Sequence, residues 1–265
     1  MKNIMPLLMF CLTATIGAAR SATPPVGGEL PITGHIGADI AARLHVLLGD
    51  GKAHILRVNS SGGDDLPALS LAQDIRQSHS TLIVDGLCAG PCANYLFVAA
   101  SRRIVQPGAL VIFSSSATSR LAMVPAARSK DVADNYASTA AQERQLLAGT
   151  RVDPALLLDS QRQLGIDCYS LTSHNPAGKA YINFKAQFIG WVPSREYLAH
   201  VGIKSEGFWP GAALQFQTAL QNAFPGGARG NIAYSGVIRP APSATLLAEL
   251  GKTRECDAGL PRRLK

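Results

Sequence analysis

Apolar and polar positions follow two alternating periods along the first half of the chain. Short continuous apolar runs, typical of buried strands, occupy residues 30–35, 54–58, 81–84, 103–105 and 109–113. Between them, apolar residues recur every three or four positions, as on one face of a helix, at residues 38–48, 66–77 and 91–100. Strands that alternate with helices pair in parallel through crossover connections, so this pattern predicts an α/β fold.

The second half of the chain is predicted to be mainly helical. Helical periodicity covers residues 131–147 and 153–164, and the second of these segments opens with an Asp-Pro pair that favours a helix start. Residues 180–192 predict a strand or a hairpin, and residues 194–201 predict a short helix.

We assign residues 29–225 to one α/β domain, which is long enough to bury a full core. The segment that follows, residues 226–265, is rich in glycine and proline, and we expect an irregular C-terminal tail there. Residues 22–28 have a similar composition and are expected to form a mobile lead-in.

The first 21 residues have the pattern of a signal peptide. Lys2 gives a short positive region, residues 4–17 are apolar and uncharged, and the small residues Ala19 and Ser21 suit cleavage before Ala22. The alternative is a membrane anchor, but the apolar run is shorter than the ~20 residues that a spanning helix needs. We therefore predict export with cleavage, and no membrane association afterwards.

Composition indicates a globular protein, because 47% of the residues are hydrophobic and 16% are charged. Removal of residues 1–21 takes two of the 25 basic residues, which leaves 23 against 18 acidic ones and a net charge of +5. The basic residues are scattered, apart from Arg262, Arg263 and Lys265 at the end. A nucleic-acid surface needs basic residues clustered on one face, so we expect no nucleic-acid partner.

Four cysteines belong to the predicted mature chain: Cys88, Cys92, Cys168 and Cys256. An even number in an exported protein favours disulfides, for which three connectivities exist. The six histidines are scattered, and no histidines and cysteines share the spacing of a metal site. We therefore predict neither a metal nor a cofactor.

Cys88 and Cys92 stand four residues apart across a predicted helix start. One helical turn rises ~5.4 Å, which puts their α-carbons about 6 Å apart, near the upper end of the disulfide range. A bond forms if Gly90 and Pro91 bend this first turn, and Cys168 then pairs with Cys256. The alternative is that Cys88 and Cys92 are buried thiols in a tight helix, and both readings stay open.

Three short motifs occur in order on the predicted strands and turns. They are Asn59-Ser60-Ser61-Gly62-Gly63, Gly86-Leu87-Cys88-Ala89-Gly90-Pro91-Cys92 and Ala109-Leu110-Val111-Ile112-Phe113-Ser114. The ordered set resembles the Clp-protease/crotonase superfamily, in particular its exported bacterial branch, which has an N-S-P-G-G-like turn, a G-x-C-A-S-A-C nucleophile turn and an I-G-F-H strand. The resemblance covers about residues 30–115 and, more faintly, residues 191–211. It implies a repeated β-β-α spiral with a mostly parallel sheet and a helical second half, located in the bacterial periplasm or medium.

The resemblance also implies that three parts of the family's serine hydrolase site are missing. The nucleophilic serine corresponds to Gly90, and the general-base histidine corresponds to Ser114, whose hydroxyl cannot take up a proton near neutral pH. Two backbone N–H groups of the family bind the oxyanion, one in the turn of Gly62 and Gly63 and one at the position of Pro91. Proline has no N–H group, and the loss of one such donor typically costs ~10²–10³ in rate.

A different serine or cysteine can act as the nucleophile only if a general base lies beside it. Serines are common in turns and at strand ends, and no pattern places a histidine, lysine or aspartate next to those at the expected cleft, which are Ser60, Ser61, Ser114, Ser115 and Ser116. A thiolate at Cys88 or Cys92 is a further alternative, against a disulfide or a buried thiol. His174 is the one histidine that we consider as a displaced base, against an exposed loop residue.

These observations favour an exported, catalytically inactive Clp-protease-like protein that keeps a groove for an extended peptide or protein partner beside Gly62 and Gly63. One alternative is a serine peptidase or esterase with a non-standard nucleophile. Another is a scaffold subunit, because members of this superfamily often form homo-oligomers. Resemblance in fold does not choose among these functions.

Overall fold

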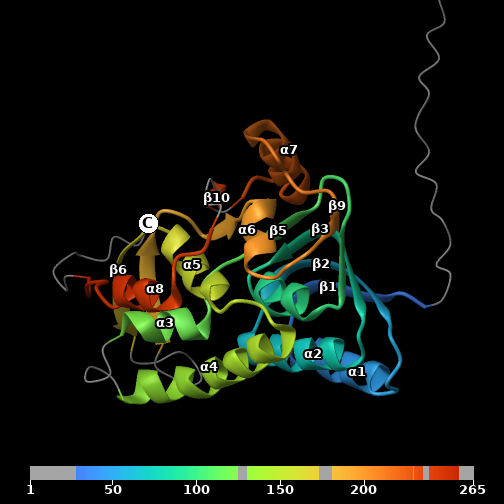
Figure 1. Cartoon of the computed structure of the whole chain (residues 1–265), viewed down its shortest axis with the longest axis horizontal. Helices are drawn as coiled ribbons and strands as arrows, with labels where there is room; N and C mark the ends of the chain where they lie inside the picture. The colour runs from blue at the N-terminus through green and yellow to red at the C-terminus, as the bar shows by residue number, and fades with distance from the viewer. Residues whose placement is uncertain (1–27, 125–129, 173–180, 229, 235–238, 257–265) are drawn as a thin grey trace, which may run out of the picture.

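A computed structural model describes residues 28–124, 130–172, 181–228, 230–234 and 239–256. The predicted signal peptide lies outside the described residues, as does all but the last residue of the predicted lead-in. Figure 1 shows a central sheet with helices against it and a separate group of helices beside it.

The central sheet is built from the segments that the apolar pattern predicts. In chain order the elements are β1 (Leu30–Ile36), α1 (Ala38–Leu48), β2 (Ile55–Gly63), α2 (Asp65–Gln77), β3 (Thr81–Ala89), η1 (Cys92–Phe97), β4 (Arg102–Val105), β5 (Leu110–Ile112) and β9 (Glu206–Gly207). The strand order is β1-β2-β3-β4-β9, β5 also pairs with β3, and every one of these pairs is parallel. The predicted α/β fold with a mostly parallel sheet is therefore confirmed.

Alternating burial along β2 shows that one face of this strand lies against the core. Leu56, Val58 and Ser60 are buried on the core side of the strand, and the residues between them are more exposed. Both α1 and α2 lie below this part of the sheet (Figure 1), and their apolar stripes are buried. The two helices thus cover the face that the strand pattern leaves apolar.

Two strands extend beyond their predicted ends, and this corrects the prediction of a turn at residues 59–64. β2 continues through Gly63, and β3 continues past Gly86 to Ala89. The pairing of β2 with β3 shifts register between Val58 and Ser60, and Gly86 has a φ of 113° at this irregularity. A glycine at a bulge lets a strand bend and continue, where the sequence alone suggests an end.

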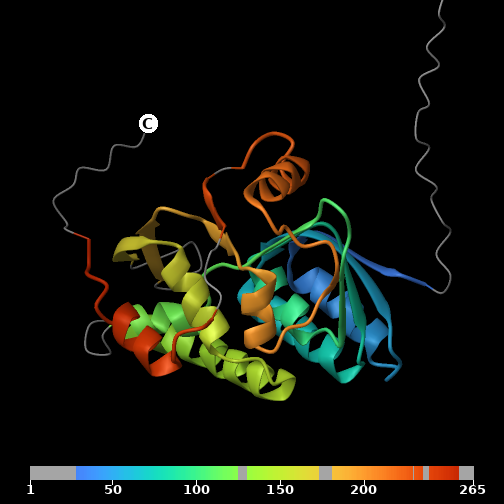
Figure 2. The same cartoon turned by 45° about the horizontal axis from the view of Figure 1, so that its top comes forward.

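A second, smaller sheet covers the far end of β5. β8 (Gly190–Val192) pairs in parallel with β10 (Ile232–Tyr234), and Phe113 and Trp191 form an antiparallel bridge between β5 and this sheet. The predicted short helix is confirmed as α6 (Arg195–His200), and α7 (Ala213–Ala223) stands at the top of the molecule in both views (Figures 1 and 2).

The remaining elements form the helical half beside the sheet (Figure 2). They are α3 (Ala117–Met123), α4 (Lys130–Thr150), α5 (Ala155–Gln163), β6 (Ile166–Thr172), β7 (Tyr181–Ala186) and α8 (Ser243–Leu250). The predicted helices at 131–147 and 153–164 correspond to α4 and α5. The predicted strand or hairpin at 180–192 instead supplies two strands of different sheets, because β7 pairs with β6 in an antiparallel hairpin and β8 pairs with β10.

The described part of the C-terminal segment is not the irregular tail that its glycine and proline content predicts. It contains β10 and α8, and Leu246 and Leu250 of α8 are buried in a cluster with Met123 and Leu158. Apolar contacts with helices far away in the sequence therefore order this segment. Among the described residues, none of the helices has the length and hydropathy needed to cross a bilayer.

Candidate functional site

A cavity of about 340 Å³ opens where β2, β3 and β5 end. Its apolar lining comes from Leu87, Ala89, Ile112, Ile189, Phe224 and Ile232. The rest of its lining consists of Gly63, Gly90, Pro91, His35, Ser61 and Ser114. All three motifs found in the sequence thus contribute to one cavity, as expected where parallel strands end at a common edge.

Gly90 and Ser114 face each other in this cavity. Gly90 has a φ of 55°, and an ideal β-carbon built on it would lie 3.3 Å from Ser114 Oγ. The Gly90 N–H donates to Ile112 O at 2.9 Å, which anchors the turn to β5. The structure therefore brings together the two positions that the resemblance gives to nucleophile and base, and neither carries a side chain suited to that role.

Gly62, near the end of β2, packs directly against Pro91. A β-carbon on Gly62, whose φ is 113°, would lie 3.0 Å from Ala89 O and 3.2 Å from Pro91 Cδ. The Gly62 N–H donates to Ser60 Oγ at 3.1 Å. This N–H is engaged within the protein, and Pro91 has no N–H to offer. Pro91 therefore cannot donate to a ligand, and the N–H of Gly62 is engaged by Ser60 in this arrangement.

Each serine near the cavity has a definable environment. Ser60 is 1% exposed, and its hydroxyl lies 2.5 Å from Gly34 O, so it ties β1 to β2. Ser115 Oγ accepts from Arg120, and Ser116 Oγ caps α3 by accepting from the N–H of Ser119. These three hydroxyls serve the structure. Ser61 and Ser114 are the two serines that line the cavity.

Hydrogen bonds from two helices hold the end of the strand that carries Ser114. Asn94 of η1 donates from Nδ2 to the carbonyls of Ser114 and Ser115, both at 3.2 Å, and accepts from the Ser114 N–H. Ser160 of α5 donates to Ser114 O at 2.9 Å. The backbone at Ser114 is thus rigidly placed, while its own hydroxyl makes no hydrogen bond with any described residue.

A buried carboxylate fixes the segment that follows. Glu143 of α4 is fully buried and accepts from the N–H groups of Ala117 and Thr118, both at 2.8 Å, and from the Tyr95 hydroxyl at 2.5 Å. Burial and the neighbouring carboxylate raise the pKa of Tyr95 well above its usual value, so its hydroxyl keeps its proton and donates. The helical half is thereby tied to the wall of the cavity.

His35 is a residue of this cavity that sequence reasoning missed. It lies at the end of β1, beside Gly62 of β2 in the strand register, and its Nε2 atom is 3.4 Å from Asp64 Oδ1. No sequence pattern places a histidine beside the serines of the cleft, and His35 nevertheless lines the same cavity as Ser61 and Ser114. The signal was available, because β1 and β2 were both predicted as parallel strands and their carboxyl ends must lie together. His174 lies outside the described residues.

Both predicted disulfides are present. Cys88 and Cys92 are bonded with their α-carbons 5.2 Å apart, and Cys168 and Cys256 are bonded with theirs 5.0 Å apart. The buried-thiol alternative is therefore wrong, and neither Cys88 nor Cys92 is a thiolate. Their α-carbons are closer than one helical turn requires because Cys88 still belongs to β3, and the chain turns sharply at Gly90 before the helix begins.

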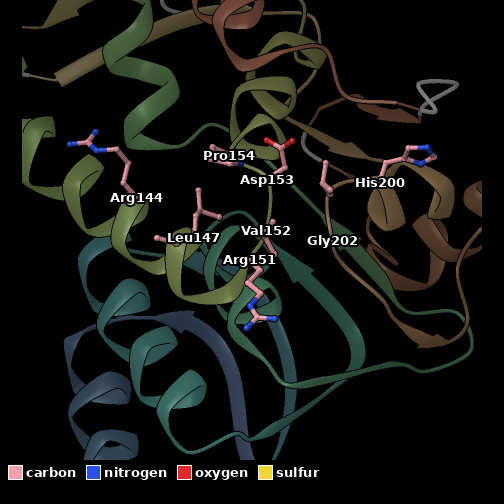
Figure 3. A pocket seen from close by; sticks show the side chains of 10 residues that line it. Arg144, Leu147, Arg151, Val152, Asp153, Pro154, His200 and Gly202 are labelled. Carbon is pink, nitrogen blue, oxygen red and sulfur yellow. The ribbon is translucent and has the colours of Figure 1, made fainter.

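A second cavity, of about 700 Å³, lies between the end of α4, the start of α5 and α6. Figure 3 shows that the charged ends of Arg144, Arg151, Asp153 and His200 point in different directions. A binding site needs polar groups that converge on one point, and this cavity lacks them. No group of three or more histidine, cysteine, aspartate or glutamate side chains is arranged to hold a metal within the described ranges.

Comparison with known proteins finds a distant structural similarity and no match in sequence. No protein-family model matches the chain, and no curated protein matches it. Among solved structures it is similar to a point mutant of ClpP1 from Listeria monocytogenes, with 15% identity and a TM-score of 0.36; the match covers 46% of this chain and 71% of that one. A similarity of this size concerns the fold alone and assigns no role to any residue.

Proposed function

We propose that this chain is an exported Clp-protease-like protein that binds an extended peptide in the cavity beside Gly62 and Gly63 and does not hydrolyse it. The observation that carries the proposal is the position of Gly90, whose missing side chain would face Ser114 inside a retained cavity. Covalent catalysis at this turn needs a nucleophile, and glycine has none.

The oxyanion side of the site supports the same conclusion. Pro91 lacks an N–H, and the N–H of Gly62 is bound to Ser60. A tetrahedral intermediate formed here would lack the donor expected at the position of Pro91, and loss of one such donor typically costs ~10²–10³ in rate. The expected nucleophile, the expected base and one oxyanion donor are thus all absent.

Binding of a peptide is supported by the composition of the cavity. Its lining combines six apolar side chains with the hydroxyls of Ser61 and Ser114, at the open ends of strands. A mostly apolar lining with a few polar groups is typical of ligand sites, in which apolar pockets take side chains and polar groups fix the orientation of the ligand.

The test is a binding measurement with a groove-filling variant. The probe is fluorescein-labelled α-lactalbumin, reduced and alkylated so that it stays unfolded, followed by fluorescence anisotropy. Ser61→Trp fills the cavity mouth, and Ser70→Trp is the matched control, because Ser70 is an exposed serine of α2. We expect saturable binding that Ser61→Trp weakens at least about tenfold, or about 1.4 kcal/mol, and that Ser70→Trp leaves unchanged. Absence of binding, or equal loss in both variants, contradicts the proposal.

One observation favours the competing function, a serine hydrolase with a non-standard nucleophile. Ser61, Ser114 and His35 line the same cavity, and Asp64 lies beside His35. Against this, neither serine hydroxyl is hydrogen-bonded to His35 among the described residues, and an activated nucleophile requires such a bond at least in the reacting complex. A scaffold role has no comparable observation in its favour.

Export is part of the proposal, and the two disulfides support it. Disulfides of this kind persist in oxidising compartments such as the periplasm or the extracellular medium. The proposed route is cleavage of the N-terminal signal peptide.

A further inference from the structure

His35 is the one titratable residue among those that line the cavity of Gly90 and Ser114. We propose that His35 selects the ligand of this groove by donating a hydrogen bond, in its protonated form, to a neutral carbonyl oxygen of the bound peptide. This inference rests on the proposed peptide-binding function and names the group that the ligand must present.

Hydrogen bonds fix the backbone next to His35. Gly34 has a φ of 74°, and its carbonyl accepts from Ser60 Oγ at 2.5 Å. The same hydroxyl accepts from the Gly62 N–H, and His35 is paired with Gly62 in the register of β1 and β2. The buried Ser60 therefore fixes both the end of β1, which carries His35, and the end of β2 at Gly62. A recognition residue on such support presents its side chain at a defined point.

Two carboxylates lie close to the His35 side chain. Asp64, between β2 and α2, places Oδ1 3.4 Å from His35 Nε2. Asp39, in the first turn of α1, is the second: an ideal β-carbon on Gly37 would be 2.9 Å from Asp39 Oδ1 and 3.7 Å from His35 Cδ2. Histidine is the residue type whose charge changes between about pH 5 and 8, so a comparison across this range tests its part in binding.

These two carboxylates also determine the class of ligand. Asp64 faces Nε2, which leaves Nδ1 to donate, and the His35 side chain is 64% exposed and accessible to a ligand. Two carboxylates beside one imidazolium give a local net negative charge. An acidic ligand group is therefore repelled, while a neutral acceptor such as a peptide carbonyl is not. The hydroxyls of Ser61 and Ser114 and the apolar lining add no charge to the cavity.

The experiment compares pH 5.5 with pH 8.0 for two forms of the unfolded α-lactalbumin probe. Acetylation converts the lysines of one form into neutral amides, and succinylation converts those of the other into carboxylates, so the two forms differ in their number of acidic groups. The variant is His35→Gln. The matched control is His45→Gln, because His45 of α1 is 67% exposed and lies 3.0 Å from Asp74 in a pair of the same kind away from the cavity. Circular dichroism confirms that both variants are folded.

We expect the wild-type protein to bind the acetylated probe about tenfold more tightly at pH 5.5 than at pH 8.0, and more tightly than the succinylated probe. His35→Gln should retain binding at pH 8.0 and lose the gain at acid pH, whereas His45→Gln should keep the gain. A pH dependence that survives in His35→Gln overturns the role of His35 while leaving peptide binding intact. Tighter binding of the succinylated probe overturns the preference for a neutral group. If the wild type binds neither probe at either pH, the proposed function fails, and this inference fails with it.

Discussion

A β-carbon on Gly90 would lie 3.3 Å from Ser114 Oγ, so these two residues face each other at the point where strands β3 and β5 end. A serine and a histidine at these positions would be in contact. The cavity between them has apolar walls and two hydroxyls. The fold thus brings the two positions together in one cavity, where Gly90 offers no nucleophile and Ser114 offers no base.

Introducing a serine at Gly90 and a histidine at Ser114 should not produce full hydrolase activity. The double variant Gly90→Ser with Ser114→His supplies a nucleophile and a base, but Pro91 still lacks an N–H. We expect hydrolysis of an activated p-nitrophenyl ester to stay low in the double variant and to rise ~10²–10³-fold when Pro91→Ala is added. Pro91→Ala alone is the control and should be inactive. Equal activity of the double and triple variants would show that the missing donor does not matter.

The disulfide between Cys168 and Cys256 should stabilise the fold more than the disulfide between Cys88 and Cys92. It joins residues 88 apart and secures the segment in which Cys256 N–H donates to Tyr169 O at 2.7 Å. In the chain-entropy model, closure of a loop of this length contributes about 4–5 kcal/mol. We expect Cys168→Ser with Cys256→Ser to lower the free energy of unfolding in urea by that order, and more than Cys88→Ser with Cys92→Ser. The opposite ranking would mean that the C-terminal segment is not held by this bond.

Asp65 should give a pH dependence of stability that is opposite to the usual one for a carboxylate. Burial raises its pKa, despite the opposing charge of Arg120, whose Nη1 lies 3.4 Å away. An acid whose pKa is raised on folding is destabilising when ionised, and this penalty disappears as pH falls through the raised pKa. We therefore expect the stability of the wild type relative to Asp65→Asn to increase from pH 7 towards pH 4 in urea unfolding.

Glu206 is the control, because its contribution to stability should change with pH in the direction opposite to that of Asp65. Arg102 donates to it through two nitrogens and lowers its pKa, so its contribution is present at pH 7 and is lost on acidification. The pair is exposed, and its effect should be small. If Asp65→Asn and Glu206→Gln change with pH in the same direction, the burial of Asp65 has been misjudged.

Export predicts a specific mature N-terminus. Cleavage of the signal peptide should leave a chain that begins between Arg20 and Thr23, recovered from the periplasm or the medium of a bacterial host. Intact-mass measurement of that fraction decides the point. A mass that retains residues 1–17 would indicate an anchored protein.

Much of the sheet follows from local patterns, because each strand and crossover helix has its own period of apolar residues. The three motifs are likewise runs of consecutive residues, so they are visible in the sequence without knowledge of distant contacts. The part of the site that escaped prediction depends on residues that are distant in sequence. His35 joins the cavity through the pairing of β1 with β2, and Glu143 contacts Tyr95 from 48 positions away. A buried glutamate in a helix of mixed polarity has no periodic signal, and α8 is ordered by contacts that its own composition does not show.

The most direct test of the account is covalent labelling of the mature protein with a fluorophosphonate probe, followed by mass spectrometry of the intact chain and its peptides. Such probes react with an activated serine, and the structure gives neither Ser61 nor Ser114 a hydrogen-bonded base among the described residues. We predict no adduct above the level of the heat-denatured protein, and no hydrolysis of the unfolded α-lactalbumin probe under conditions where it binds. Stoichiometric labelling of Ser61, Ser114 or any other serine would contradict the account and identify the nucleophile of a hydrolase.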